Sequence, residues 1–185
     1  MDEIDTILTE IERRIKKKPI TVGINGLDCS GKTTCAQALY EKLVSRNINS
    51  RLLHIDDYNN RDVQDRVYTA HKEGVFTDEL ADIYYQNSIH YKVVAEAISA
   101  SRQQYDVTLI EGVFLFKDDL VQSMDIKIFL SIEPSLARAR YEKRKLSIAD
   151  ARPASVFDDI WLPAFNRYCR EVKPESRSDF MHHQG

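Results

Sequence analysis

Hydrophobic positions follow a helical spacing at the start of the chain and then form a short continuous run. The first apolar residues stand three or four positions apart, at Ile4, Ile7, Leu8, Ile11 and Ile15. That spacing places them on one face of an α-helix, so residues 1–18 are expected to form an N-terminal amphipathic helix that ends near Pro19. Residues 19–24 are mostly apolar and β-branched, which predicts a buried β-strand.

Helical and strand patterns alternate along the rest of the chain. The further elements expected are helices at about 32–46 and 79–100, strands at 51–55, 107–110 and 126–130, and a helix that begins at Glu133 and Pro134. Because helices separate the strands, the connections must cross over and the strands must lie parallel. The pattern predicts an α/β fold on a parallel sheet, with a long polar stretch before the 79–100 helix.

Residues suited to ligand binding follow three of the predicted strands. A glycine-rich turn follows the first strand, Asp56 ends the second, and Glu111 ends the third. The carboxyl ends of parallel strands lie at one edge of a sheet, where ligands of such folds bind. We therefore expect these distant parts of the chain to converge on one site.

The composition is that of an ordinary globular chain. Its 185 residues are 43% hydrophobic and 30% charged, which suits one folded domain over residues 1–185. With 26 Lys and Arg against 29 Asp and Glu, the formal charge is −3, so no overall positive field would attract nucleic acid or an anionic membrane. We expect neither as a partner.

The N-terminus and the cysteines indicate a location. The first residues are acidic and lack the apolar core of a signal peptide, and the longest apolar run, 113–116, is too short to span a bilayer. The three cysteines form no CxxC pair, and their odd number argues against a disulfide framework. The cytoplasm, a reducing compartment, is the expected location.

The most specific motif is GLDCSGKT at residues 26–33, here named the phosphate loop. It matches G-x-x-x-x-G-K-[ST] between a predicted strand and a predicted helix, which is the setting in which this motif binds phosphate. Loop amides would hold phosphate oxygens, Lys32 would reach the β- and γ-phosphates from the exposed mouth of the loop, and Thr33 would bind Mg²⁺. The residues expected to bind the nucleotide are Gly26, Asp28, Cys29, Ser30, Gly31, Lys32, Thr33 and Thr34.

Other segments separate the classes of protein that carry such a loop. The chain has no Asn-Lys-x-Asp element for guanine recognition, and its one Asp-x-x-Gly match, residues 28–31, lies inside the phosphate loop. A switch GTPase is therefore not expected. An ATP-driven motor would need additional segments, for which a single domain leaves little chain. A small-molecule kinase fits best.

Two acidic positions fit phosphoryl transfer. The Asp56-Asp57-Tyr58 run places carboxylates where a hydroxyl acceptor would need a group to take its proton, although aspartates also serve as turn or cap residues. Glu111 would hold Mg²⁺ directly or through water, as the acidic residue of a Walker-B strand does. The alternative for Glu111 is a solvated carboxylate at a strand end.

The helix after residue 133 is rich in basic residues. Arg140 and Arg144 stand four positions apart and share one face. In a phosphotransferase they would fold over the nucleotide and stabilise the charge on the transferred group. The alternative is a basic helix that faces solvent.

Taken in order, these motifs resemble the uridine kinase and nicotinamide riboside kinase group of phosphate-loop kinases over roughly residues 19–180. The segments that carry the resemblance are residues 26–34, 54–58 and 110–114, the Arg-rich helix, residues 161–168, and Asp179 with Phe180. The chain departs from the group at Lys145, where an Asp is common, and over 59–78, which matches no nucleoside-binding pattern.

The resemblance implies a P-loop NTPase fold, with a five-stranded parallel sheet flanked by helices and a helical Arg-rich lid at about 134–150. It implies ATP and Mg²⁺ as cofactors. By this resemblance Asp56 is the aspartate that activates the acceptor hydroxyl, Glu111 the acid on the magnesium side, and Arg140 and Arg144 the arginines of the lid. The expected catalytic residues are Asp56, Lys32, Arg140 and Arg144, and the expected metal ligands are Thr33 and Glu111.

The leading hypothesis is an ATP-dependent kinase that transfers the γ-phosphate to a hydroxyl of a metabolite, with uridine-like or nicotinamide riboside-like nucleosides among the candidate acceptors. Two alternatives stand beside it. One is a nucleotide-binding regulatory protein without efficient transfer, and the other is a kinase for a phosphorylated or acidic acceptor. The sequence leaves open the choice between ATP and GTP and the oligomeric state.

Overall fold

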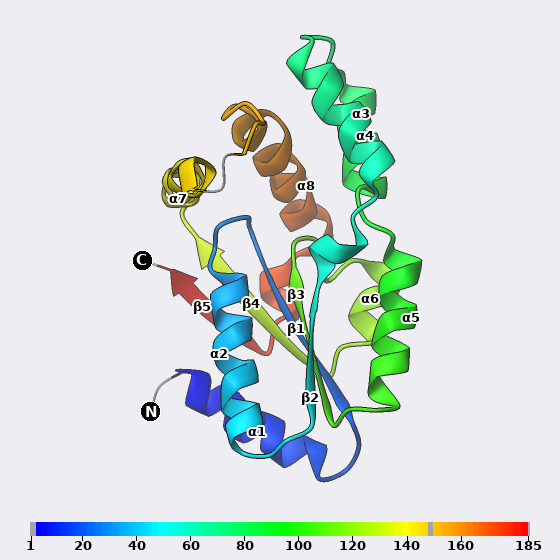
Figure 1. Ribbon diagram of the computed structural model, residues 1–185, viewed down its shortest axis with the longest axis vertical. Coiled ribbons are helices and arrows are strands. Elements are labelled where there is room, and N and C mark those ends of the chain that lie inside the picture. Colours follow the sequence, from blue (N-terminus) through cyan, green and yellow to red (C-terminus); the bar gives the residue numbers. More distant parts are fainter. Residues whose placement is uncertain (1–2, 148–149, 185) are drawn as a thin grey trace.

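Five parallel strands form a central sheet with helices on both faces (Figure 1). The computed structural model describes residues 3–147 and 150–184. The first half of the chain forms α1 (Glu3–Ile15), β1 (Ile20–Gly26), α2 (Lys32–Ser45), β2 (Ser50–His54), the 3₁₀ turn η1 (Ile55–Tyr58), α3 (Arg61–Lys72) and α4 (Asp78–Asn87). The second half forms α5 (Tyr91–Arg102), β3 (Val107–Gly112), α6 (Asp118–Gln122), β4 (Ile126–Ile132), α7 (Pro134–Ser147), the π-helix η2 (Phe157–Trp161), α8 (Leu162–Val172), the 3₁₀ turn η3 (Pro174–Arg177) and β5 (Phe180–Gln184).

The strands lie in the order β2-β3-β1-β4-β5, and each neighbouring pair is parallel. In the centre, Ile24 of β1 stands beside Glu111 of β3 on one side and Ile128 of β4 on the other. The chain leaves β1 toward β2 and later crosses it to reach β4, so the carboxyl end of β1 is a point where connections diverge. Open α/β sheets bind ligands at such points.

Each face of the sheet has its own apolar core. On one face, α1 and α2 bury leucine and isoleucine side chains such as Leu8, Ile11 and Leu39 against β1, β3 and β4. On the other, residues of α4, α5, α7, η2 and α8, including Tyr141 and Tyr168, pack with Ile110 and Phe129. Alternate residues of a strand point to opposite faces, which explains why Leu109 and Ile110 belong to different cores.

The predicted five-stranded parallel sheet flanked by helices is confirmed. The N-terminal helix expected over 1–18 is α1, and the basic helix expected over about 134–150 is α7; residues 1, 2, 148 and 149 of these two predictions lie outside the described residues. The fifth strand forms as well. Asp179 places it, because its backbone N–H donates to Lys127 O and its carboxylate accepts from Lys127 N–H, each at 2.8 Å.

The single helix predicted at 79–100 is wrong, because the segment divides into α4 and α5. Residues 88–90 separate them and bond to the chain that follows η1. The Asn60 N–H donates to Ser88 O at 2.8 Å, the His90 N–H donates to Tyr58 O at 2.9 Å, and Asn59 forms a β-bridge with Ile89. These long-range backbone bonds outweigh the continuous helical pattern and fix η1 against the start of α5.

The polar stretch 59–78 contains a helix that the sequence reading left out. α3 begins after Asn60, whose side chain caps it, and buries Val67 and Ala70. α4 begins after Thr77, whose hydroxyl accepts from Leu80 N–H. In Figure 1, α3 and α4 lie side by side and extend beyond the carboxyl edge of the sheet, next to α8.

Within residues 3–147 and 150–184, each helix is too short or too polar to cross a lipid bilayer.

Candidate active site

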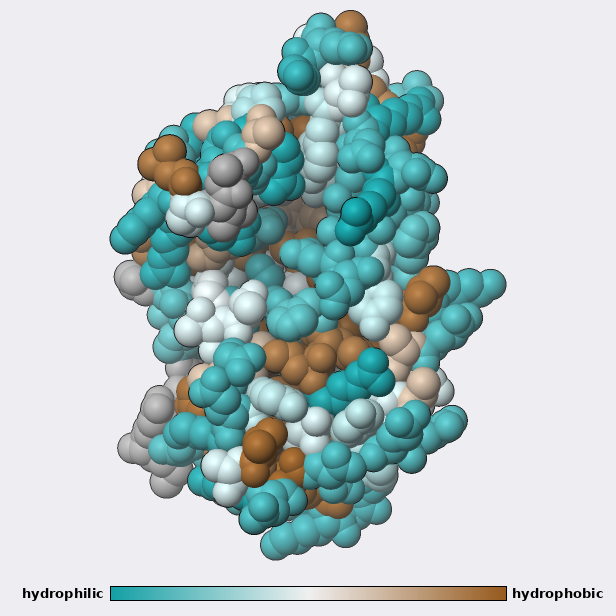
Figure 2. Space-filling view, in the orientation of Figure 1, coloured by the Kyte–Doolittle hydropathy of each residue, from teal (hydrophilic) through white to brown (hydrophobic). Residues whose placement is uncertain are grey.

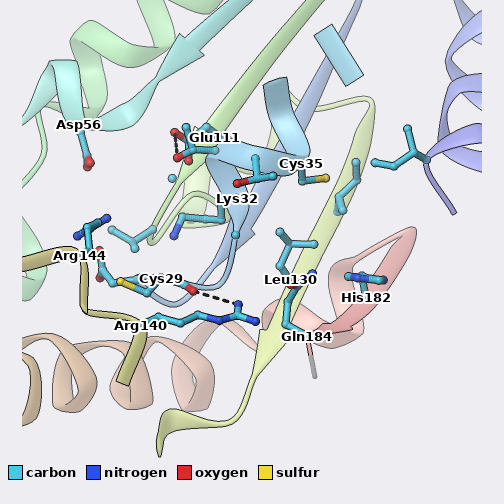
Figure 3. A pocket seen from close by; sticks show the side chains of 18 of the residues that line it. Cys29, Lys32, Cys35, Asp56, Glu111, Leu130, Arg140, Arg144, His182 and Gln184 are labelled. Carbon is cyan, nitrogen blue, oxygen red and sulfur yellow. Dashed lines mark hydrogen bonds between the residues drawn. The ribbon is translucent and has the colours of Figure 1, made fainter. Parts of the chain in front are cut away.

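A cavity of about 750 Å³ opens at the carboxyl ends of the strands, and we name it the large cavity. Its volume is in the range of sites for small molecules and cofactors. Figure 3 shows its side chains, and Figure 2 shows that the surface is hollowed between α7 and α3. The predicted site residues that line it are Asp28, Cys29, Gly31, Lys32, Thr33, Thr34, Asp56, Glu111, Arg140 and Arg144.

The remaining two predicted residues, Gly26 and Ser30, are buried beneath the phosphate loop and shape it. A Cβ on Gly26 would lie 2.5 Å from Leu130 O and 2.6 Å from Ser30 Oγ, so a side chain has no room there. Gly31 and Cys29 have positive φ angles of 89° and 63°. The loop therefore curls tightly, with glycine at the position next to the first turn of α2.

The phosphate loop has the polar groups that a phosphate would need. Among the described side chains none caps the amino end of α2, whose first amides point toward the loop. The buried Ser30 hydroxyl has no hydrogen-bond partner in the described part of the chain. Lys32 was expected at the exposed mouth of the loop; this is wrong, because it is 8% exposed and its Nζ donates to Leu27 O at 2.8 Å. The loop holds this ammonium group inside its curve.

One carboxylate oxygen of Glu111 contacts a side chain from α2 and a side chain from β2. Thr33 Oγ1 donates to Glu111 Oε1 at 3.0 Å, and His54 Nδ1 lies 2.7 Å from the same oxygen. Sheet register produces the second contact, since His54 at the end of β2 is the direct neighbour of Glu111 on β3. The Glu111 carboxyl is almost buried, at 7% exposure, so the strand-end carboxylate does not face open solvent.

The alternative of a solvated Glu111 is therefore wrong, and its surroundings fit Mg²⁺. Thr33 and Glu111 supply two adjacent oxygen atoms, which are the ligands that this ion prefers. Among the described residues, no group of three or more His, Cys, Asp or Glu side chains could hold a metal ion. Mg²⁺ commonly binds to one or two protein oxygens and takes the others from water and substrate phosphates.

Asp56 lies on η1 at the edge of the large cavity, facing the phosphate loop across it (Figure 3). Enclosure by the surrounding protein raises the pKa of its carboxyl group, and the negative charges of Asp28 and Glu111 raise it further, against the opposing effects of Lys32 and Arg144. Asp57 is not among the described residues that line either cavity of this site. Neighbouring positions thus have different surroundings.

Helix α7 brings two arginines to the large cavity. Arg140 donates to Cys29 O in the phosphate loop at 3.4 Å, and Arg144 lies beside Asp56 in Figure 3. Arg138, on another side of α7, forms ion pairs with Asp158, at 2.7 Å, and Glu142. At the end of the helix, Lys145 Nζ donates to Asp150 O at 2.6 Å.

A second cavity of about 80 Å³, the small cavity, adjoins the first. Both are lined by Asp28, Asp56, Val113 and Arg144. The rest of its wall comes from the segment after η1, from α3 and α4, and from the chain after α7, with Asn59, Gln64, Tyr68, Tyr84, Ser88, Ile89, Arg152 and Trp161.

The aromatic wall of the small cavity holds one cation. The Trp161 Nε1–H donates to Tyr68 Oη at 3.1 Å, and the Arg152 guanidinium lies 4.8 Å from the centre of the Trp161 ring. The charge of Arg152 is matched by Asp150, whose Oδ1 accepts from Arg152 Nε at 2.9 Å. The sequence did not indicate Arg152, Tyr68 or His54 as parts of the site. His54 could be placed at the end of a strand, but its pairing with Glu111 depends on the sheet register, which the sequence does not give.

Comparisons with known proteins agree with this architecture. No protein-family model matches the chain. A uridine kinase of Leuconostoc citreum is 26% identical over 182 residues, which is 86% of this chain and 84% of that protein. Among solved structures, a possible uridine kinase of Bacillus stearothermophilus has a TM-score of 0.69 at 19% identity and covers 98% of this chain and 97% of its own. A candidate fructose transport system kinase of Silicibacter has a TM-score of 0.67 at 16% identity and covers 98% and 99%.

The resemblance that the motifs indicated is thereby confirmed. Curated relatives named uridine kinase align with most of this chain, and the chain has the fold of phosphate-loop kinases. Small-molecule kinases are therefore the proteins to which it is similar, at identities of 21–28% among the relatives compared.

Proposed function

We propose that this chain is an ATP-dependent kinase that transfers the γ-phosphate of ATP to a hydroxyl group of a small, neutral metabolite. The observation that carries the proposal is the junction of the two cavities. Asp56 and Arg144 line both, so a phosphate donor in the large cavity and an acceptor in the small cavity would meet between a carboxylate and a guanidinium. Holding two reactants in this way supplies much of the rate enhancement of phosphoryl transfer.

The phosphate loop holds the donor in this proposal. Its amides and Lys32 bind the β- and γ-phosphates, with the buried Lys32 ammonium already positioned by Leu27 O. Thr33 and Glu111 would hold Mg²⁺, which would neutralise part of the negative charge of the phosphates. Preorganised charge of this kind needs no rearrangement as the reaction proceeds.

Asp56 accepts the proton of the acceptor hydroxyl in this mechanism. The raised pKa of its carboxyl group makes the Asp56 carboxylate a stronger base than an ordinary aspartate. As the acceptor oxygen bonds to the γ-phosphorus, Arg140 and Arg144 stabilise the negative charge on the transferred group. ADP leaves with the electrons of the broken bond between phosphorus and the bridging oxygen.

The charges at the small cavity favour a neutral acceptor over a phosphorylated one. A phosphorylated acceptor needs cations that are available to it. Arg152 is already paired with Asp150, and the shared wall carries the carboxylates Asp28 and Asp56. Hydroxyl and amide groups, such as those of Tyr84 and Gln64, suit the hydroxyl groups of a sugar, polyol or nucleoside.

A screen for acceptor-dependent ADP formation tests the proposal. Purified chain with ATP and Mg²⁺ is supplied with nucleosides, including uridine and nicotinamide riboside, with sugars such as fructose, and with their phosphate esters. We expect one neutral compound to give a phosphate monoester detectable by phosphorus NMR. Nucleotide binding without any acceptor-dependent product would instead identify a regulatory protein, and a product formed only from phosphate esters would refute the neutral acceptor.

A further inference from the structure

His54 contacts the carboxylate of Glu111 from outside the two cavities. Its Nδ1 lies 2.7 Å from Glu111 Oε1. Glu111 lines the large cavity, as Figure 3 shows, whereas His54 is not among the described residues that line either cavity. A bound phosphate or metal ion would therefore meet Glu111 and not the imidazole. Any contribution of His54 to the site must pass through this carboxylate.

The direction of the hydrogen bond follows from the chemistry of its two partners. A carboxylate has only acceptor atoms, so the proton lies on His54 Nδ1, which donates to Glu111 Oε1. The Thr33 hydroxyl donates to the same oxygen at 3.0 Å. Two donors, one from the end of β2 and one from the first turn of α2, thus converge on one oxygen atom and oppose rotation of the carboxylate group.

This arrangement prepares the Thr33 hydroxyl for a cation. A hydroxyl group has one proton and two lone pairs. Because the Thr33 proton is directed at Glu111 Oε1, the lone pairs of Thr33 Oγ1 remain available to a metal ion. Rotation of the Glu111 carboxylate would release the hydroxyl, which could then turn its proton toward the ion and oppose binding. The hydrogen bond from His54 acts against that rotation.

The backbone that carries His54 is fixed against β3. His54 ends β2 and is the register neighbour of Glu111. The next residue, Ile55, is 1% exposed, and a Cβ on Gly112 would collide with its side chain, so the two segments approach closely. The His54 side chain itself is 38% exposed, so replacing its ring removes little from the core. Loss of the imidazole should therefore affect Glu111 more than it affects the fold.

We propose that His54 is a positioning residue for the metal ion of phosphoryl transfer. Its Nδ1–H holds Glu111, and through Glu111 the Thr33 hydroxyl, in the orientation that binds Mg²⁺. Groups that hydrogen-bond to metal ligands orient those ligands, and their loss typically lowers metal affinity by about 10- to 100-fold. The inference rests on the proposed function, because it concerns the metal ion of that reaction.

Two variants of similar shape test this inference by metal binding, without turnover. Asn and Leu side chains both branch at Cγ, but only Asn places an N–H close to the position of His54 Nδ1. Mn²⁺, which prefers the same oxygen ligands as Mg²⁺, is titrated into the complex of the chain with ADP, and electron paramagnetic resonance measures the free ion. We expect His54→Leu to weaken Mn²⁺ binding by about 10- to 100-fold. His54→Asn should lie closer to the wild type than to His54→Leu.

Two controls separate positioning of the metal ligands from a structural role. ADP binding in the presence of EDTA measures the phosphate loop without a metal ion, and it should be the same in the wild type and in both variants. His183→Leu is the matched histidine control, since His183 is exposed on β5, at the opposite edge of the sheet from β2. It should change neither Mn²⁺ binding nor ADP binding.

Each outcome bears on a different statement. Equal Mn²⁺ affinity in the wild type and His54→Leu would overturn the inference. An equal loss in His54→Asn and His54→Leu would also overturn it, because the ring and not its N–H would then matter. A parallel loss of ADP binding in EDTA would do the same, since His54 would then shape the loop or the fold. All three results leave the proposed function standing, whereas failure of the wild type to bind ADP with Mn²⁺ would overturn the proposed function itself.

Discussion

Lys32 occupies the interior of the phosphate loop, where its ammonium group donates to Leu27 O at 2.8 Å. Replacing it removes a positioned charge, but its buried stem also contributes to packing, so Lys32→Met is a better test than an alanine. We expect turnover to fall by about 10²- to 10³-fold, the usual effect of losing one preorganised donor. Steady-state rates and circular dichroism check this; near-normal transfer by a folded Lys32→Met protein would contradict the loop assignment.

Asp56 lines both cavities, whereas Asp57 is not among the described residues that line either of them. Asp56→Asn keeps the shape of the side chain and removes the proton acceptor, so transfer should fall by about 10²- to 10⁴-fold with little change in ADP binding. Asp57→Asn is the matched control and should lose much less activity. The opposite ranking of the two variants, measured with one acceptor, would reverse the assignment of the base.

We expect the Asp56 carboxylate to lower the stability of the folded protein at neutral pH. Enclosure and the nearby acidic groups raise the pKa of Asp56 in the folded protein, so its ionised form is less favourable there than in the unfolded chain. At neutral pH, Asp56→Asn should therefore have a higher Tm than the wild type. As pH falls through the raised pKa the wild-type carboxyl becomes neutral, and the difference should vanish. Thermal unfolding across that range checks this, and a lower Tm for the variant at pH 7 would contradict it.

At the scale of elements, α7 presents different arginines to different surroundings. Arg144 lines both cavities, whereas Arg138 pairs with Asp158 and Glu142. Arg144→Ala should lower single-turnover rates by about 10²-fold or more and change the ADP dissociation constant much less, because its charge acts on the transferred group. Arg138→Ala is the control for losing an arginine from this helix. Equal losses in rate and affinity for Arg144→Ala would indicate ground-state binding instead.

The sequence predicted those elements whose form depends on local pattern. The phosphate loop could be located because its motif lies between an apolar strand and a helix, and α1 because its apolar stripe is regular. The break between α4 and α5 could not, since it depends on bonds from Tyr58 and Asn60 to residues far along the chain. The small cavity could not be predicted for the same reason, because Tyr68, Arg152 and Trp161 come to it from separate segments of the chain.

Across the whole molecule, the proposed catalytic residues and a stabilising cluster around Asp125 lie at opposite edges of the sheet. The carboxyl ends of the strands hold the cavities, while Asp125 lies near the amino end of β1, in the loop before β4. Its carboxylate accepts from Lys18 Nζ at 2.6 Å, from Arg102 Nη1 at 2.5 Å and from the Thr21 N–H at 2.9 Å. One side chain thus ties the chain after α1, the end of α5 and the first strand together.

Asp125→Asn should weaken this junction without touching the site. Burial by itself would raise the pKa of Asp125, but the hydrogen bonds from Lys18, Arg102 and the Thr21 N–H outweigh it and hold the pKa below the ordinary value. A lowered pKa means that the carboxylate stabilises the fold at neutral pH and that this contribution disappears as pH falls through the folded pKa. At pH 7 we expect the free energy of unfolding of the variant to be about 1–3 kcal/mol lower than that of the wild type, as for charged hydrogen bonds. This difference should shrink as the pH falls. Urea unfolding at several pH values measures this difference. Turnover per folded molecule should be unchanged, because Asp125 lies at the far edge of the sheet. A variant as stable as the wild type at pH 7, or one that is folded but inactive, would contradict the separation of the two edges.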